Sequence, residues 1–184
     1  MPEKTLSLQG RELFEAELAG RRQRVMRYLL EGPYPQRFAP THLQEAALSY
    51  VRRGGKALRA MVLLLSCGSM GGNEEKALPA AAAVEIYHLW TLVHDDIIDR
   101  DDLRRGGQTV HYEFSRRASE ELGYLGEEAR HYGLTLAILA GDLQQAWAVS
   151  LLSELHPRGN VDPALVLALI REMEGQVTPT LLEG

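Results

Sequence analysis

The feature that most limits the folds open to this chain is a long apolar stretch in its C-terminal half. Residues Tyr132 to Leu155 follow a helical pattern that is apolar around most of the circumference. Such a helix has no polar face to present to water, so it belongs inside a bundle of other helices. Asp142, Gln144 and Gln145 interrupt its most apolar part, and we therefore expect no membrane span. The sequence predicts an all-α protein.

The remaining segments also favour helices, with Gly, Pro and capping residues at their ends. Thr41 followed by Gln44 has the pattern of a capping box, and Asp162-Pro163 pairs an N-cap with a proline in the first turn. We expect residues Gly123 to Glu128 to be a loop, and strand signals are nearly missing. The further helices are expected at Ser7–Leu30, Thr41–Arg53, Lys56–Met70, Asn73–Asp99, Thr109–Arg117, and from Asp162 to Gly175 or beyond.

Composition narrows the class of protein. A chain of 184 residues, 45% hydrophobic and without repeats or linkers, is expected to form a single helical domain over residues 1–184. The formal net charge of -5 argues against a nucleic-acid partner. Cys67 is the only cysteine, and Met1 to Gly20 is too polar for a signal peptide, so we expect a cytoplasmic protein.

An acidic cluster near the middle of the chain is the strongest candidate for a functional site. Five aspartates lie within the eight residues from Asp95 to Asp102, and Arg104, Arg105 and Gly106 follow. Carboxylates this close repel one another unless cations neutralise them, and Mg²⁺ prefers oxygen ligands from one or two carboxylates, water and phosphates. The paired guanidinium groups match diphosphate oxygens. The pattern predicts a site for a Mg²⁺-diphosphate; the alternative is a solvated acidic helix end.

Helical spacing groups the candidate ligands on one face. Asp95 and Asp99 are one turn apart, and His88 falls on the same stripe. His88 lies about 10 Å from Asp95 along the helix axis, from the rise per residue. That separation is too long for a shared metal ion, and it suits the opposite end of one extended site.

These motifs resemble those of the trans-prenyl diphosphate synthases, also called polyprenyl synthetases. Residues His94 to Gly106 are similar to the first aspartate-rich motif of that family and the Leu-Arg-Arg-Gly that follows it. The resemblance extends from about Gly54 to Gly184. The other matching segments, in the expected order, are Gly54-Gly55-Lys56-Ala57-Leu58-Arg59, Glu85-Ile86-Tyr87-His88, Thr109-Val110-His111, Leu139-Ala140-Gly141-Asp142 and Glu174-Gly175-Gln176.

The resemblance implies a helical bundle of the isoprenoid synthase type, a homodimer, and head-to-tail condensation of isopentenyl diphosphate with an allylic diphosphate. It places Asp95, Asp96, Asp99 and Arg104 in the catalytic centre. It implies that Asp95 and Asp99 bind Mg²⁺, that Arg104 holds the allylic diphosphate and that Gln176 faces the allylic pocket. The residues implied to bind isopentenyl diphosphate are Lys56, Arg59, His88 and Arg105.

The length of the product is expected to depend on the helix that leads into the aspartates. Tyr87 and Thr91 share the Asp95 side of that helix, and Trp90 lies toward its flank. In the family that the chain resembles, bulky side chains on this helix form the floor of the hydrophobic pocket, which implies that a large ring within two turns of the metal site stops chain growth early. We therefore expect a short product, farnesyl or geranylgeranyl diphosphate.

Departures from the family pattern keep two other functions open. Ala57, Ala60 and Pro179 replace residues usual in the family, and a second aspartate-rich motif is missing, so we expect a bundle that is incomplete at the C-terminus. One alternative is a non-catalytic chain that binds a diphosphate or a partner subunit. The other is a metal phosphohydrolase of the HD type, suggested by His94-Asp95, which the dense acids and the arginine pair fit poorly.

Overall fold

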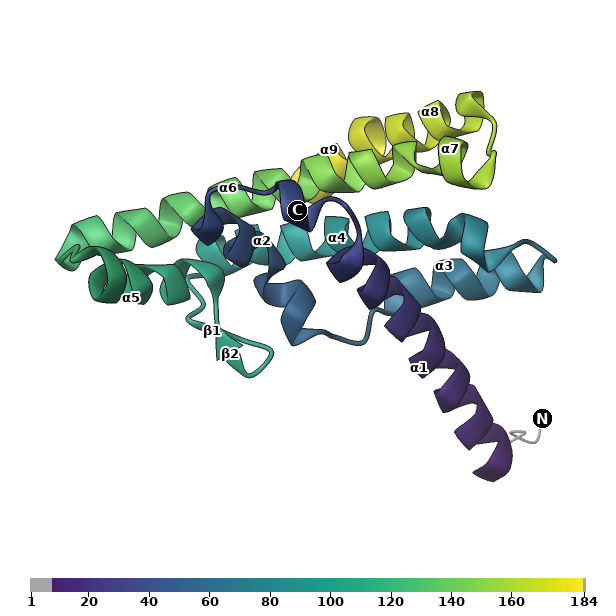
Figure 1. Cartoon of the computed structure of the whole chain (residues 1–184), viewed down its shortest axis with the longest axis horizontal. Helices are drawn as coiled ribbons and strands as arrows, with labels where there is room; N and C mark the ends of the chain where they lie inside the picture. The colour runs from purple at the N-terminus through teal and green to yellow at the C-terminus, as the bar shows by residue number, and fades with distance from the viewer. Residues whose placement is uncertain (1–7, 184) are drawn as a thin grey trace.

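The computed structural model describes residues 8–183 as a bundle that is almost entirely helical (Figure 1). At its centre α4 (Glu74–Asp99) packs lengthwise against α6 (Gly126–Ser153), with α3 (Leu58–Ser69) on α4 and α5 (Val110–Leu122) on α6. The all-α prediction is confirmed. The other elements are α1 (Leu8–Glu31), the 3-10 turn η1 (Pro35–Arg37), α2 (Thr41–Arg53), β1 (Leu103–Arg104), β2 (Gly107–Gln108), α7 (Leu155–Gly159), α8 (Pro163–Glu172), the π-helical turn η2 (Met173–Val177) and α9 (Thr178–Glu183).

The interior position of α6 depends on glycine as well as on apolar side chains. A Cβ atom at Gly141 would collide with the His94 ring of α4, and one at Gly133 would collide with the backbone of α5. Glycine therefore lets both neighbours approach the α6 backbone closely. Trp147 and Leu151 are buried in the core, whereas Ile138 stays 42% exposed. The predicted interior helix thus retains an uncovered apolar face.

One continuous stretch of the described residues, Gly126–Gly159, is long and apolar enough to cross a membrane by length and composition alone. Of its most apolar window, 44% is already buried against the rest of the protein. Buried core helices pass the same test, so the expectation of no membrane span stays a prediction.

Both helices around the expected loop Gly123–Glu128 are longer than predicted. α5 continues to Leu122 rather than ending near Arg117, and α6 begins at Gly126 rather than Tyr132. On α5, ion pairs between residues one turn apart stabilise the extra turn. At the start of α6, two glutamates in the first turn interact favourably with the positive end of the helix dipole.

Capping predictions met mixed outcomes. Asn73 accepts hydrogen bonds from the backbone of Glu75 and Lys76 and so caps α4, and the predicted N-cap at Asp162 is confirmed. The capping box at Thr41 is wrong: Pro40 takes the N-cap position, and the Gln44 amide instead donates to a backbone carbonyl of η1.

The loop after α4 contains a short hairpin that the sequence did not indicate. β1 pairs antiparallel with β2, and Arg105 and Gly106 form the two-residue turn between them with φ angles of 52° and 75°. Two positive φ angles give a turn whose twist matches that of the paired strands. The turn also sends the neighbouring side chains of Arg104 and Arg105 to different partners.

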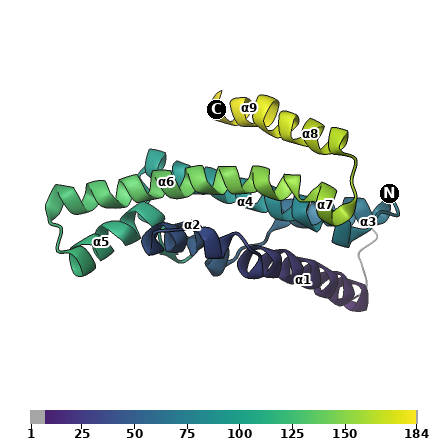
Figure 2. The same ribbon diagram turned by 45° about the horizontal axis from the view of Figure 1, so that its top comes forward.

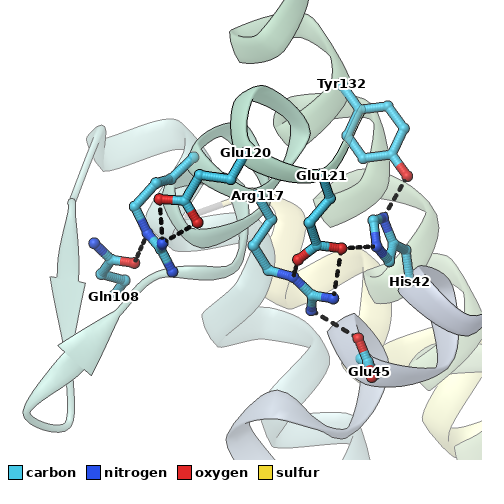
Figure 3. Close-up of polar contacts among 8 residues, drawn as sticks. His42, Glu45, Gln108, Arg117, Glu120, Glu121 and Tyr132 are labelled. Carbon is cyan, nitrogen blue, oxygen red and sulfur yellow. Dashed lines mark hydrogen bonds and ion pairs between the residues drawn. The ribbon is translucent and has the colours of Figure 1, made fainter. Parts of the chain in front are cut away.

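A polar network fastens α5 to α2 and α6 (Figure 3). His42 contacts the Tyr132 hydroxyl at 2.7 Å and Glu121 at 2.9 Å, and Arg117 joins Glu121 to Glu45. Hydrogen bonds from Arg117 and then His42 lower the pKa of Glu121 to about 2. This network holds the end of the bundle beyond the hairpin together.

The C-terminal segment lies along the side of α4 and α6 that faces away from α1 and α2 (Figure 2). The single helix expected from Asp162 is interrupted by η2, in which the backbone N–H of Thr178 bonds to the carbonyl of Met173. The expected start of the first helix at Ser7 lies outside the described residues.

Candidate active site

The exposed carboxylates of the predicted metal site lie at the C-terminal end of α4. Asp95 and Asp99 are both exposed, and neither side chain forms a hydrogen bond or an ion pair with residues 8–183. No cluster of three or more His, Cys, Asp or Glu side chains that could hold a metal occurs among those residues. Two oxygen ligands are nevertheless the donor set that suits Mg²⁺, which takes its other ligands from water and phosphate.

Asp96 differs from its neighbours because it points into the protein. It is 1% exposed and accepts hydrogen bonds from the Tyr50 hydroxyl and from Nε of Arg104. Burial, together with the bond to Asp96, raises the pKa of Tyr50. Arg104 also reaches Asp101 at 3.4 Å. Asp96 therefore fixes Arg104 and the hairpin against α2. Both of its carboxylate oxygens are hydrogen-bonded within the protein.

A basic recess of about 440 Å³ lies beside α4, between the α2–α3 loop and the hairpin. We use the name basic recess for the recess bounded by Lys56, Arg59, Glu85, His88 and Arg105. Arg105 donates to the Gly54 carbonyl at 2.6 Å, and its guanidinium fills the space where a side chain at Gly55 would stand. Within residues 8–183 no carboxylate pairs with Lys56, Arg59 or Arg105. The structure thus gathers the side chains predicted for the isopentenyl diphosphate site.

His88 is electrically neutral in this setting. Burial, followed by the positive charges of Arg59, Arg105 and Arg104, lowers the pKa of its ring to about 4. The three arginines are therefore close enough for their positive charges to disfavour protonation of this ring. An anion bound in the recess would offset that field and favour the protonated ring.

Glu85 is a site residue whose role the sequence did not reveal. It is 1% exposed, and its Oε2 finds no hydrogen-bond partner in the described part of the chain. Burial raises its pKa, and the nearby charges of Arg105 and Arg59 act in the opposite direction. The sequence signal for it was the family-like segment Glu85-Ile86-Tyr87-His88, which assigned no role to Glu85.

An apolar cavity of about 390 Å³ adjoins the basic recess. Arg59 and His88 line both spaces, so they form a shared wall between them. The predicted residues Tyr87 and Thr91 line the cavity as well. Its other lining residues come from α3, α4, α6 and the C-terminal segment: Leu63, Ala80, Val84, Leu152, Leu169, Glu172, Met173, Val177 and Leu181.

Two predicted residues lie elsewhere. Trp90 is not among the residues that line the cavity; its ring packs edge-on against Tyr87 at 5.0 Å, and its Nε1 donates to Nδ1 of His94 at 3.1 Å. Gln176 is exposed in η2 and lines neither the cavity nor the basic recess. The Trp90 prediction rested on helical periodicity, which gives direction around an axis and not the residues that stand opposite. The Gln176 prediction rested on the family resemblance.

Comparison with known proteins points to one family. The family profile of the polyprenyl synthetases matches residues 40–180. Among similar proteins, a geranylgeranyl diphosphate synthase of Sulfolobus acidocaldarius is 44% identical over 112 residues, 61% of this chain and 28% of the relative. A geranylgeranyl pyrophosphate synthase of Geoglobus acetivorans is 42% identical over 114 residues, 62% of this chain and 30% of the relative.

Solved structures agree with the sequence matches. The geranylgeranyl pyrophosphate synthetase of Pyrococcus horikoshii superposes with a TM-score of 0.70 at 30% identity, covering 89% of this chain and 42% of that one. The synthetase of Geoglobus acetivorans gives 0.67 at 33% identity, with 85% and 43% covered. This chain therefore spans less than half the length of these relatives.

Proposed function

Because the chain belongs to the polyprenyl synthetase family, we propose that it takes part in Mg²⁺-dependent head-to-tail condensation of isopentenyl diphosphate with an allylic diphosphate. The observation that supports this most strongly is the wall of Arg59 and His88 between a basic recess and an apolar cavity. A charged space next to an apolar one suits substrates with a diphosphate head and a hydrocarbon tail.

In this proposal the acidic end of α4 binds the allylic diphosphate. Asp95 and Asp99 would hold Mg²⁺, and the bound ion would supply positive charge against the charge that develops on the leaving diphosphate. Arg104 supplies hydrogen bonds to the same group, and Asp96 acts by keeping Arg104 in place. The catalytic roles of these four residues rest on charge and orientation, so no protein nucleophile is required.

The basic recess binds isopentenyl diphosphate through Lys56, Arg59, His88 and Arg105. The terminal double bond of the isopentenyl group attacks C1 of the allylic group as the bond from C1 to the diphosphate breaks. A new carbon–carbon bond forms, and the proton lost from the isopentenyl unit goes to the departing diphosphate. The protein contributes orientation and the exclusion of water from the reacting carbons.

We assign the apolar cavity to the growing prenyl chain. Tyr87 and Thr91 line it, Trp90 supports the Tyr87 ring, and Gln176 would reach the allylic pocket only through a change at η2. Several relatives carry geranylgeranyl diphosphate synthase in their names, which supports a product of that length or the shorter farnesyl diphosphate.

We further propose that residues 1–184 form one cytoplasmic domain that pairs as a homodimer. The uncovered apolar face of α6 supports pairing, because exposed apolar stripes of this kind favour association. Leu134, Ile138 and Leu139 are 37%, 42% and 48% exposed on that face.

A product assay tests the proposed function. The chain is incubated with Mg²⁺, farnesyl diphosphate and radiolabelled isopentenyl diphosphate, and the extracted prenyl alcohols are separated by length. We expect labelled geranylgeranyl product, lost in the Asp95→Asn, Asp99→Asn double variant.

The alternative function is that of a diphosphate-binding chain or a partner subunit. Two findings favour it: the chain covers only part of its relatives, and it matches a chloroplastic heterodimeric synthase large subunit of Arabidopsis thaliana. Diphosphate binding without product in the assay would support that alternative.

A further inference from the structure

One side-chain hydrogen bond joins two elements that line the apolar cavity. The Tyr87 hydroxyl on α4 lies 2.8 Å from Oγ1 of Thr178, the first residue of α9. Tyr87 lines the cavity, and so do Val177 and Leu181 on either side of Thr178. The two residues are 91 positions apart in the sequence. We call this contact the Tyr87–Thr178 bridge.

The π-helical turn η2 brings Thr178 to this position. The Met173 carbonyl accepts the backbone N–H of Thr178, and Oγ1 of Thr178 donates to the same carbonyl at 2.9 Å. Oγ1 of Thr178 thus contacts both the Met173 carbonyl and the Tyr87 hydroxyl. One-turn π-helical insertions change the direction in which the following side chains point. A regular helix through these residues would turn Thr178 away from Tyr87.

The Tyr87 ring is fixed from both sides. Its hydroxyl is bound to Thr178, and its ring packs at a steep angle against the ring of Trp90, which is itself bonded to His94. The ring is 7% exposed. A tyrosine held at its hydroxyl and at its ring cannot rotate to make room for a longer ligand without losing the bridge.

We propose that Thr178 is a specificity-determining residue that limits the length of the bound prenyl chain by holding the Tyr87 ring in its place at the wall of the cavity. This inference rests on the proposed function, because it assigns the cavity to the prenyl tail. It concerns positioning: Thr178 acts through Tyr87 and touches no reacting atom.

The test compares ligands of different tail length on the intact chain. Affinities for geranyl diphosphate, with ten carbons, and geranylfarnesyl diphosphate, with twenty-five, are measured with Mg²⁺ for the wild type, Thr178→Val and Tyr87→Phe. Phenylalanine keeps the ring, so Tyr87→Phe removes the bridge alone. Valine keeps the shape of threonine, and Thr178→Val removes both the bridge and the bond from Oγ1 to the Met173 carbonyl. We expect either variant to bind the long ligand about tenfold more tightly, part of the value of burying one further isoprene unit, with geranyl diphosphate unchanged.

Two controls make the result specific. Thr180→Val alters an exposed threonine of the same helix and should leave both affinities unchanged. The double variant Thr178→Val, Tyr87→Phe should shift selectivity no further than either single change, because both remove the same bond.

The outcomes separate the two proposals. Equal changes for both ligands, or none, would show that the bridge only stabilises the fold and would overturn its role in selectivity. If the wild type binds neither ligand, the proposed function fails and this inference fails with it.

Discussion

The acidic end of α4 and the basic recess each contain one buried carboxylate, and the two carboxylates differ in their hydrogen-bond partners. Asp96 accepts a hydrogen bond from Tyr50 and is paired with Arg104, whereas Glu85 finds no partner for its Oε2 within residues 8–183. The adjacent Arg104 and Arg105 differ in the same sense, since only Arg104 has a carboxylate partner there. The acidic end is therefore braced by the protein itself. The basic recess keeps positive charge that an incoming anion can neutralise.

The largest expected effect is on stability and comes from removing the ion pair between Asp96 and Arg104. Asp96→Asn removes the charge that holds Arg104 and should lower the free energy of unfolding by about 3 kcal/mol, as expected when one member of a buried pair is lost. Asp95→Asn, one residue away and exposed, should change it by less than about 0.5 kcal/mol. Urea unfolding followed by circular dichroism measures both. Equal effects of the two variants would mean that Asp96 is no more structural than its neighbour.

Removing a cation from the basic recess should weaken anion binding and leave the free energy of unfolding unchanged. Arg59→Ala should reduce the affinity for inorganic pyrophosphate in the absence of Mg²⁺ by about 10–100-fold, the value of a charge-assisted contact. Arg116→Ala, an exposed arginine paired with Glu120 on α5, is the matched control. The same affinity in both variants would remove Arg59 from the binding site.

The smallest effect concerns the pH dependence of stability. The pKa of His88 is lowered from 6.5 to about 4 in the folded protein. As the pH falls from 6.5 toward 4, the unfolded chain takes up a proton at this position before the folded chain does. Stability contributed by His88 is therefore present above pH 6.5 and lost toward pH 4. His88→Asn should make the fall in melting temperature over this interval shallower. An unchanged slope would indicate that His88 titrates normally.

Helical periodicity predicted most of the fold and the face shared by His88, Asp95 and Asp99, because these follow from spacing along one helix. It could not separate Asp96 from Asp95, since the burial of Asp96 depends on Tyr50, which lies 46 residues away in the sequence. Strands of two residues have no periodicity, so the hairpin that directs Arg104 and Arg105 to different partners left no signal.

The bond between Tyr87 and Thr178 was beyond sequence reasoning for the same reason. It depends on a π-helical turn and on a segment that packs against α4 from far along the chain. Tyr87 could be chosen from its place on the helix, whereas its partner could not. Local pattern thus identified the charged groups, and tertiary packing decided which of them are free.

The central claim is that one diphosphate binds at the acidic end only with Mg²⁺, and another binds in the basic recess without it. Calorimetric titration of the chain with inorganic pyrophosphate tests this most directly. In excess chelator we expect one binding event, which Arg59→Ala weakens. With Mg²⁺ a second event should appear, and the Asp95→Asn, Asp99→Asn double variant should lose it. The same single event with and without Mg²⁺, unaffected by changing Asp95 and Asp99, would contradict the account.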